Sequence, residues 1–75
     1  NMEPMLVTLF PGTPAPLVSH GGQEFNYVIK GKVKVTVGGR EQILSEGDSI
    51  YFDPREPHGQ AAVDEEASFL TVIQE

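Results

Sequence analysis

Polar residues and valines alternate over residues 32–37, KVKVTV. Successive side chains of a β-strand point to opposite sides, so this pattern predicts a strand with one buried and one solvent-facing side. Residues 24–30, EFNYVIK, are rich in aromatic and β-branched types and predict a second strand. Gly31 separates the two runs, and we expect it to join them as a hairpin.

Turn-forming residues divide the rest of the chain into short apolar stretches. Because no window shows a helical period with caps, the pattern predicts an all-β sandwich or barrel. Within 40–44 we expect Ile43 and Leu44 to point inward. The further strands are expected at 5–10, 17–18, 40–44, 49–52, 60–63 and 68–74, and the turns at 11–16, 38–39, 45–48, 53–57 and 64–66.

Size and composition narrow the function classes. Seventy-five residues make a single domain, 1–75, with a small core. The absence of cysteine excludes disulfides and thiolate metal sites, so a bound metal or a partner subunit is the expected source of extra stability, and a homodimer is the simpler of the two. The chain opens on Asn1 followed by Met2, from which we expect it to be part of a longer protein.

Charge and hydropathy exclude two kinds of partner. A net charge of −6 argues against direct contact with nucleic-acid phosphates, which need clustered Lys and Arg. No apolar run reaches membrane-spanning length, and the first residues do not form a signal peptide. We therefore expect a cytoplasmic protein without membrane contacts.

Three residues carry the candidate chemistry. His20 and Glu24 are separated by an even number of positions, which puts them on one strand face if Gly21 and Gly22 are extended. The only other histidine, His58, follows the stiff DPREP loop. Two imidazoles and a carboxylate form a facial triad suited to divalent iron, manganese, nickel or zinc.

Two segments of the chain resemble the cupins, small β-barrels of the double-stranded β-helix, or jelly-roll, type. The first cupin motif places a histidine, a glutamate and a glycine as His20, Glu24 and Gly31 do in HGGQEFNYVIKG. The second runs from a glycine to a proline-flanked histidine, as GDSIYFDPREPH does at 47–58. The resemblance implies that the barrel brings His58 to His20 and Glu24.

The chain departs from the cupin pattern at one position. The paired histidine of the first motif falls at 18, where this chain has Val18. Cupin enzymes usually hold their metal with three histidines and one glutamate, so one ligand is missing. The three remaining residues therefore either hold one divalent metal or form a vestigial polar site that binds a ligand or water.

The same parity argument gives a candidate ligand pocket. It turns Asn26 and Val28 inward with Glu24, and Gln60 inward with His58, while Val35 and Phe52 are expected as apolar walls. For these residues ordinary core packing is the alternative, above all for Val28 and Val35.

The resemblance is closest to the cupin half of bacterial helix-turn-helix–cupin regulators, on the segments MEPMLVTLFPG, HGGQEFNYVIKG and GDSIYFDPREPHG. It implies a domain that senses a small-molecule effector and dimerises, with DNA bound only through a separate N-terminal domain. Phe25, Tyr27 and Tyr51 are expected to cover the sheet, where they would suit a dimer interface. The alternatives are a stand-alone metal-dependent enzyme of the dioxygenase, isomerase or decarboxylase type and, third, a sugar-binding or storage cupin.

Overall fold

The computed structural model describes all 75 residues and consists of seven strands joined by turns, with no helix. None of its segments is therefore a helix that could cross a membrane. The strands are β1 (Met2–Leu9), β2 (Gln23–Lys30), β3 (Val33–Val37), β4 (Arg40–Leu44), β5 (Ser49–Phe52), β6 (His58–Ala62) and β7 (Ala67–Gln74).

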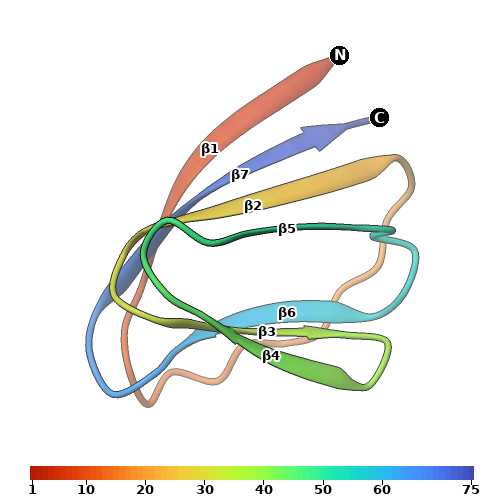
Figure 1. Ribbon diagram of the computed structural model, residues 1–75. Helices are drawn as coiled ribbons and strands as arrows, with labels where there is room; N and C mark the ends of the chain where they lie inside the picture. Colours follow the sequence, from red (N-terminus) through yellow and green to blue (C-terminus); the bar gives the residue numbers. More distant parts are fainter.

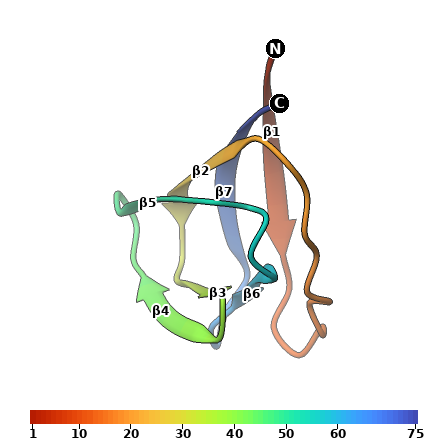
Figure 2. The same ribbon diagram turned by 90° about the vertical axis from the view of Figure 1, so that its right-hand side faces the viewer.

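The strands form two antiparallel sheets that face each other. One sheet has four strands in the order β1-β7-β2-β5, and the other has three in the order β4-β3-β6. Figure 1 shows the four-stranded sheet above the three-stranded one, and Figure 2 looks along the space they enclose. This two-sheet arrangement of short antiparallel strands confirms the predicted all-β jelly-roll class.

The core lies between the sheets and is small. It consists of seven buried apolar residues: Val28, Val33, Val35, Leu44, Phe52, Ala67 and Phe69. They come from both sheets, so alternation along each strand has directed one row of side chains into the shared interior. Leu44 points inward as predicted, but Ile43 is 54% exposed, because neighbouring residues of one strand face opposite sides.

The predicted hairpin of residues 24–30 and 32–37 is wrong. β2 pairs with β5 and β7, whereas β3 pairs with β4 and β6 in the other sheet. Gly31 lies where the chain passes between the sheets, with a φ of +76° and its N–H donating to the Glu46 carboxylate. The predicted turn at Gly38-Gly39 is correct, and it joins the paired strands β3 and β4.

Three predicted strands differ from the structure by more than one residue at an end. β1 begins at Met2 and ends at Leu9, and β6 covers His58–Ala62 instead of 60–63. Residues 17–18 contribute a single bridge, in which Val18 pairs with His58. His58 is the first residue of β6, and the bridge gives it a second backbone partner, Val18.

The two ends of the chain lie side by side. β1 and β7 pair along their whole length, from Met2 with Gln74 to Leu9 with Ala67. The Glu75 N–H donates to the Asn1 carbonyl at 3.4 Å, and both termini leave the same end of the sheet in Figures 1 and 2.

Replacing Gly31 by alanine should destabilise the fold more than the same change at Gly39. Both glycines have a positive φ, which costs an alanine about 1–2 kcal/mol. A Cβ on Gly31 would also lie 2.8 Å from the Glu66 carbonyl oxygen, whereas one on Gly39 would meet nothing within 4 Å. We expect Gly31→Ala to lower the free energy of unfolding by roughly 2–4 kcal/mol. Urea denaturation followed by circular dichroism measures both variants, and equal losses would contradict the close approach at Gly31.

Candidate metal centre

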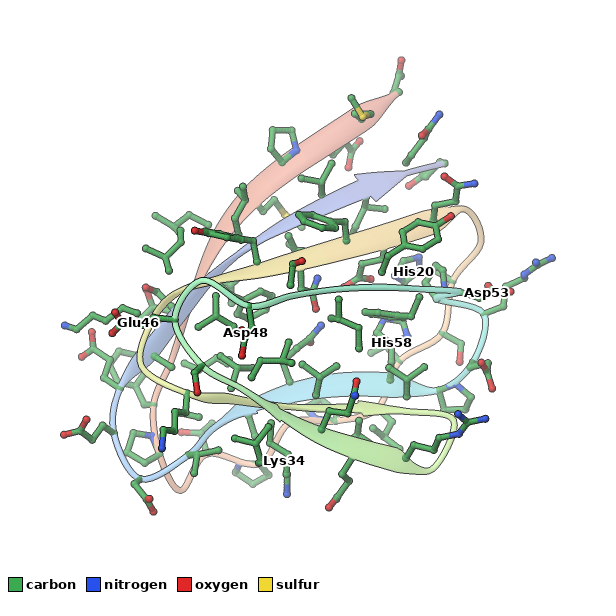
Figure 3. The ribbon with its side chains drawn as sticks, viewed as in Figure 1. His20, Lys34, Glu46, Asp48, Asp53 and His58 are labelled. Carbon is green, nitrogen blue, oxygen red and sulfur yellow. The ribbon has the colours of Figure 1, made fainter.

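Three side chains from separate segments converge at one end of the barrel. The Nε2 atom of His20 lies 3.1 Å from Oε1 of Glu24, and the Nε2 atom of His58 lies 3.2 Å from the same oxygen. One ligand atom of each residue lies within 4.8 Å of the other two. Figure 3 shows His20 and His58 together near Asp53, at the end opposite to Glu46 and Asp48. The structure thus brings together the three residues that the sequence had selected.

His20 reaches Glu24 through a bend in the backbone. The segment between them is not extended, because Gly22 has a φ of +90°. The His20 N–H donates to the Pro54 carbonyl at 2.9 Å, which fixes the histidine against the loop before β6. The condition of an extended Gly21-Gly22 segment is therefore not met, although His20 and Glu24 lie close together as expected.

His58 is held on both sides of its backbone and on its ring. Its N–H and carbonyl both pair with Val18, each at 2.9 Å. The ring of Phe52 packs against it, with ring centroids 5.0 Å apart. Only 2% of His58 is exposed.

The loop that delivers His58 has its own internal ion pair. The Asp53 carboxylate accepts hydrogen bonds from the side chain of Arg55, at 2.9 and 3.1 Å, and from its backbone N–H. The side-chain hydrogen bond from Arg55 lowers the pKa of Asp53, and the backbone bond adds to the effect. The same contact raises the pKa of Arg55. This pairing stabilises the turn that precedes the second histidine.

The hydrogen bonds of the two Nδ1 atoms determine which proton state is open to the Nε2 atoms that face Glu24. Nδ1 of His20 donates to the Gly21 carbonyl at 3.0 Å, and Nδ1 of His58 donates to the Glu56 carbonyl at 2.9 Å, because a carbonyl oxygen can only accept. In a neutral imidazole the Nε2 atom then carries a lone pair. With both imidazoles neutral, two nitrogen lone pairs and the Glu24 Oε1 atom would face one another, and such a donor set suits a divalent cation. The residues fit a metal ion.

The second oxygen of Glu24 is fixed by three donors. Oε2 accepts from Asn26 Nδ2 at 3.0 Å, from Gln60 Nε2 at 3.2 Å and from the Thr71 hydroxyl at 3.3 Å. Asn26 also donates to Thr71 and accepts from Gln60. No buried polar side-chain atom in the protein lacks a partner. Oε2 is thus committed to the interior while Oε1 faces the two histidines.

Thr71 is the participant that sequence reasoning missed. It lies on β7 opposite Asn26 and is buried. The alternation of β7 gave a signal, because Thr71 is a polar residue at an inward position that follows the buried Ala67 and Phe69.

The five predicted ligand-pocket residues do not share one cavity. Asn26 and Gln60 belong to the network around Glu24, and Val28 is part of the core. Val35 and Phe52 line a cavity of about 390 Å³, together with Val37, Arg40, Glu41, Gln42, Ile50, Asp53 and Glu56. It lies where the edge strands β4 and β5 do not pair. Because Phe52 contacts both the cavity and His58, it lies between the cavity and the candidate metal centre.

Comparison with known proteins identifies the family. A model of the cupin domain matches residues 5–73. The chain belongs to the cupin family. No curated protein matches the sequence.

Several solved structures superpose closely on this one. An HTH_3 family transcriptional regulator from Vibrio cholerae matches with a TM-score of 0.88 and 30% identity, over 99% of this chain and 43% of that one. Hydroxypropylphosphonic acid epoxidase from S. wedmorenis, in complex with fosfomycin, matches with a TM-score of 0.87 and 26% identity, over 97% and 43%. An RmlC-like cupin from Shewanella frigidimarina, 21% identical with a TM-score of 0.86, covers 96% and 64% and shares the fold. The chain therefore spans less than half of the regulator and of the epoxidase.

Val18 occupies the position where the cupin motif has its other histidine. It lies directly opposite His58 in the antiparallel bridge and is 50% exposed. A valine offers no ligand atom, so this chain has three of the four usual groups. A metal held by these three residues would have one more coordination position open to other ligands.

Replacing Thr71 by valine should destabilise the domain, because Asn26 and Glu24 would each lose a buried partner at nearly unchanged volume. We expect the free energy of unfolding to fall by about 1–3 kcal/mol. Thr71→Ser keeps the hydroxyl and removes one methyl group, so its loss should be smaller, near 1 kcal/mol. Urea denaturation measures both, and a serine variant as unstable as the valine one would show that the methyl group matters more than the hydrogen bonds.

Proposed function

We propose that this cupin is the effector-sensing domain of a transcriptional regulator. In this proposal it is one domain of a longer cytoplasmic bacterial protein, it works as a homodimer, and it binds a small molecule in its barrel. One divalent metal, Zn, Fe, Mn or Ni, would be held by His20, Glu24 and His58. DNA would be contacted only by a separate N-terminal domain.

The regulator from Vibrio cholerae is the observation that carries the proposal. It matches almost the whole of this chain at 30% identity, compared with 26% for the epoxidase. Since this chain spans 43% of the regulator, the remainder of that protein has room for a further domain. The acidic charge of −6 is consistent with this division, because phosphate contacts would fall to the other domain.

The cavity beside Phe52 supports an effector site. Its volume of about 390 Å³ is within the range of small-molecule sites, and its apolar floor with a charged and polar rim is typical of them. The ring of Phe52 packs against the ring of His58. A molecule in the cavity would therefore contact a direct neighbour of one of the three residues that would hold the metal. An effector that prefers one arrangement of the dimer would change the spacing of two recognition helices and hence DNA binding.

A metal-dependent enzyme is the second candidate, and the donor set favours it. Two histidines and one carboxylate form the facial triad of non-haem Fe(II) oxygenases. The epoxidase has been crystallised with Fe(II) and with Co(II). A bound metal would supply Lewis-acid or redox chemistry at open coordination positions. For a regulator and for an enzyme alike, His20 and His58 would bind the metal through Nε2. The hydrogen bonds to Oε2 of Glu24 keep its other oxygen, Oε1, facing the two histidines.

Metal binding should depend on Glu24 and His58. After treatment with a chelator, we expect the chain to take up one Zn²⁺ or Fe²⁺ per molecule in a calorimetric titration. Glu24→Gln and His58→Ala should weaken that binding by more than about 100-fold, since even outer-sphere partners are worth 10–100-fold. Glu41→Gln removes the same charge from an exposed pair with Lys34 and should bind metal normally. Equal metal affinity in the wild type and the three variants would show that His20, Glu24 and His58 do not form a metal site, under either proposed function.

The regulator and enzyme readings differ in what they expect upstream and in solution. The regulator reading expects a helix-turn-helix pattern encoded before Asn1, and no conversion of hydroxypropylphosphonic acid by the Fe²⁺-loaded chain in phosphorus NMR. Turnover of that phosphonate, or a translation start immediately before Asn1, would favour the enzyme instead.

A further inference from the structure

The inner side of β4 changes from apolar to polar along its length. Leu44 is buried in the core, and Gln42 and Arg40 precede it at steps of two residues on the same side of the strand. Directly paired residues share one face of a sheet, and Gln42 lies opposite the buried Val35. Both polar side chains line the cavity beside Phe52. β4 therefore directs an amide and a guanidinium toward this cavity.

Two carboxylates at the cavity are already paired with cations outside it. Glu41 lies 3.7 Å from Nζ of Lys34. Asp53 accepts a hydrogen bond of 2.9 Å from the Arg55 guanidinium. Neither Lys34 nor Arg55 lines the cavity. The protein itself thus supplies partners for these two acidic groups, which leaves them less free to bind a ligand.

The other two charged side chains at the cavity, Arg40 and Glu56, have no such partner. Neither takes part in an ion pair with each other or with any other residue. The cavity therefore has one free cation and one free anion at its rim. Between them lies an apolar floor that consists of Val35, Val37, Ile50 and Phe52.

The position of Glu56 is set by the turn that precedes β4. The Gly38 N–H donates to the Pro57 carbonyl at 2.9 Å, which holds this turn against the loop before β6. A Cβ on Gly38 would collide with the Glu56 carboxylate, so only glycine leaves room for it there. The Glu56 carbonyl also accepts from Nδ1 of His58 at 2.9 Å. The anion of the cavity is therefore placed by contacts on two sides.

We propose that the cavity beside Phe52 binds a free amino acid with an apolar side chain. This inference rests on the effector site of the proposed function and gives the chemical class of its ligand. The α-carboxylate would pair with the Arg40 guanidinium, whose planar fork suits carboxylates. The α-ammonium group would pair with Glu56, and the apolar side chain would lie on the floor of the cavity.

A zwitterion matches this rim better than a ligand with a single charge. A simple acid would bring a like charge to Glu56, in a domain whose net charge of −6 already opposes anions. A simple amine would leave Arg40 beside a second cation. The volume of about 390 Å³ lies at the small end of the range for small-molecule sites, which agrees with a ligand of amino-acid size.

Calorimetric titration with matched probes tests the ligand class. L-Leucine carries both charges, whereas 4-methylpentanoate lacks its ammonium group and isoamylamine lacks its carboxylate. All three have the same branched apolar end. We expect the wild-type chain to bind L-leucine at least about 10-fold more tightly than either analogue, because each analogue loses one charge-assisted contact.

Substitutions at the rim should act on one charge of the ligand at a time. Arg40→Gln should weaken L-leucine about 10–100-fold and leave isoamylamine unchanged, since that amine has no carboxylate to lose. Glu56→Gln should weaken L-leucine similarly and leave 4-methylpentanoate unchanged. Lys30→Gln and Glu65→Gln remove exposed charges that do not line the cavity and should bind L-leucine as the wild type does. Zn²⁺ titration of the two rim variants should also match the wild type.

Three results would overturn the proposal. The first is equal affinity of the wild type for L-leucine and its two analogues, since only the apolar floor would then bind. The second is no binding of L-valine, L-leucine or L-phenylalanine at millimolar concentration. The third is an Arg40→Gln variant that loses isoamylamine as strongly as L-leucine, because Arg40 would then shape the cavity without binding the carboxylate.

Failure of this inference can be distinguished from failure of the proposed function. A helix-turn-helix pattern encoded before Asn1, together with no amino-acid binding, would keep the regulator and give it a different effector. Amino-acid binding that depends on Arg40 and Glu56, without such a pattern, would keep this site and remove the regulator.

Discussion

The meeting of two imidazole nitrogens and one carboxylate oxygen is the contact on which this structure depends. Oε1 of Glu24 lies 3.1 and 3.2 Å from the Nε2 atoms of His20 and His58. Each imidazole is oriented from behind by a backbone carbonyl, so neither Nε2 has a free choice of role. Buried carboxylates are costly unless they are compensated, and here the three donors on Oε2 compensate half of the group. The other oxygen, Oε1, needs a cation or a histidine proton beside it.

The interior of the barrel is accordingly divided into two parts. One end contains the polar cluster around Glu24, and the rest contains the small apolar core with Val28, Val33 and Phe69. β2 changes from one part to the other within a single inward row, from Glu24 through Asn26 to Val28. A domain of 75 residues therefore gives much of its limited interior to a site, which reduces the apolar area that can stabilise the monomer.

Local pattern predicted the strands well and their partners poorly. Alternation located β3 within one residue, because the period of two is a property of the strand alone, and the Gly38-Gly39 turn located β4. It could not show that β2 and β3 belong to different sheets, since β2 pairs with β5 and β7 whereas β3 pairs with β4 and β6, and most of these partners lie far along the chain. The spacing of the cupin motifs identified the three site residues. The contact between His20 and Glu24 is correct, but it arises from a bend at Gly22 and not from their even separation along a strand. Thr71 was missed because its role exists only once β7 lies beside β2.

The adjacent chain ends have a consequence for how this unit can be rearranged. Asn1 and Glu75 share a hydrogen bond at the end of paired strands, so a short peptide could join them without disturbing either sheet. New ends could then be opened at the exposed Gly38-Gly39 turn, which lies between two paired strands of the other sheet. Such a circular permutant would keep every strand pairing while reversing the order in which His58 and Glu24 leave the ribosome. His58, the third of the three candidate ligands in the present order, would then be made first.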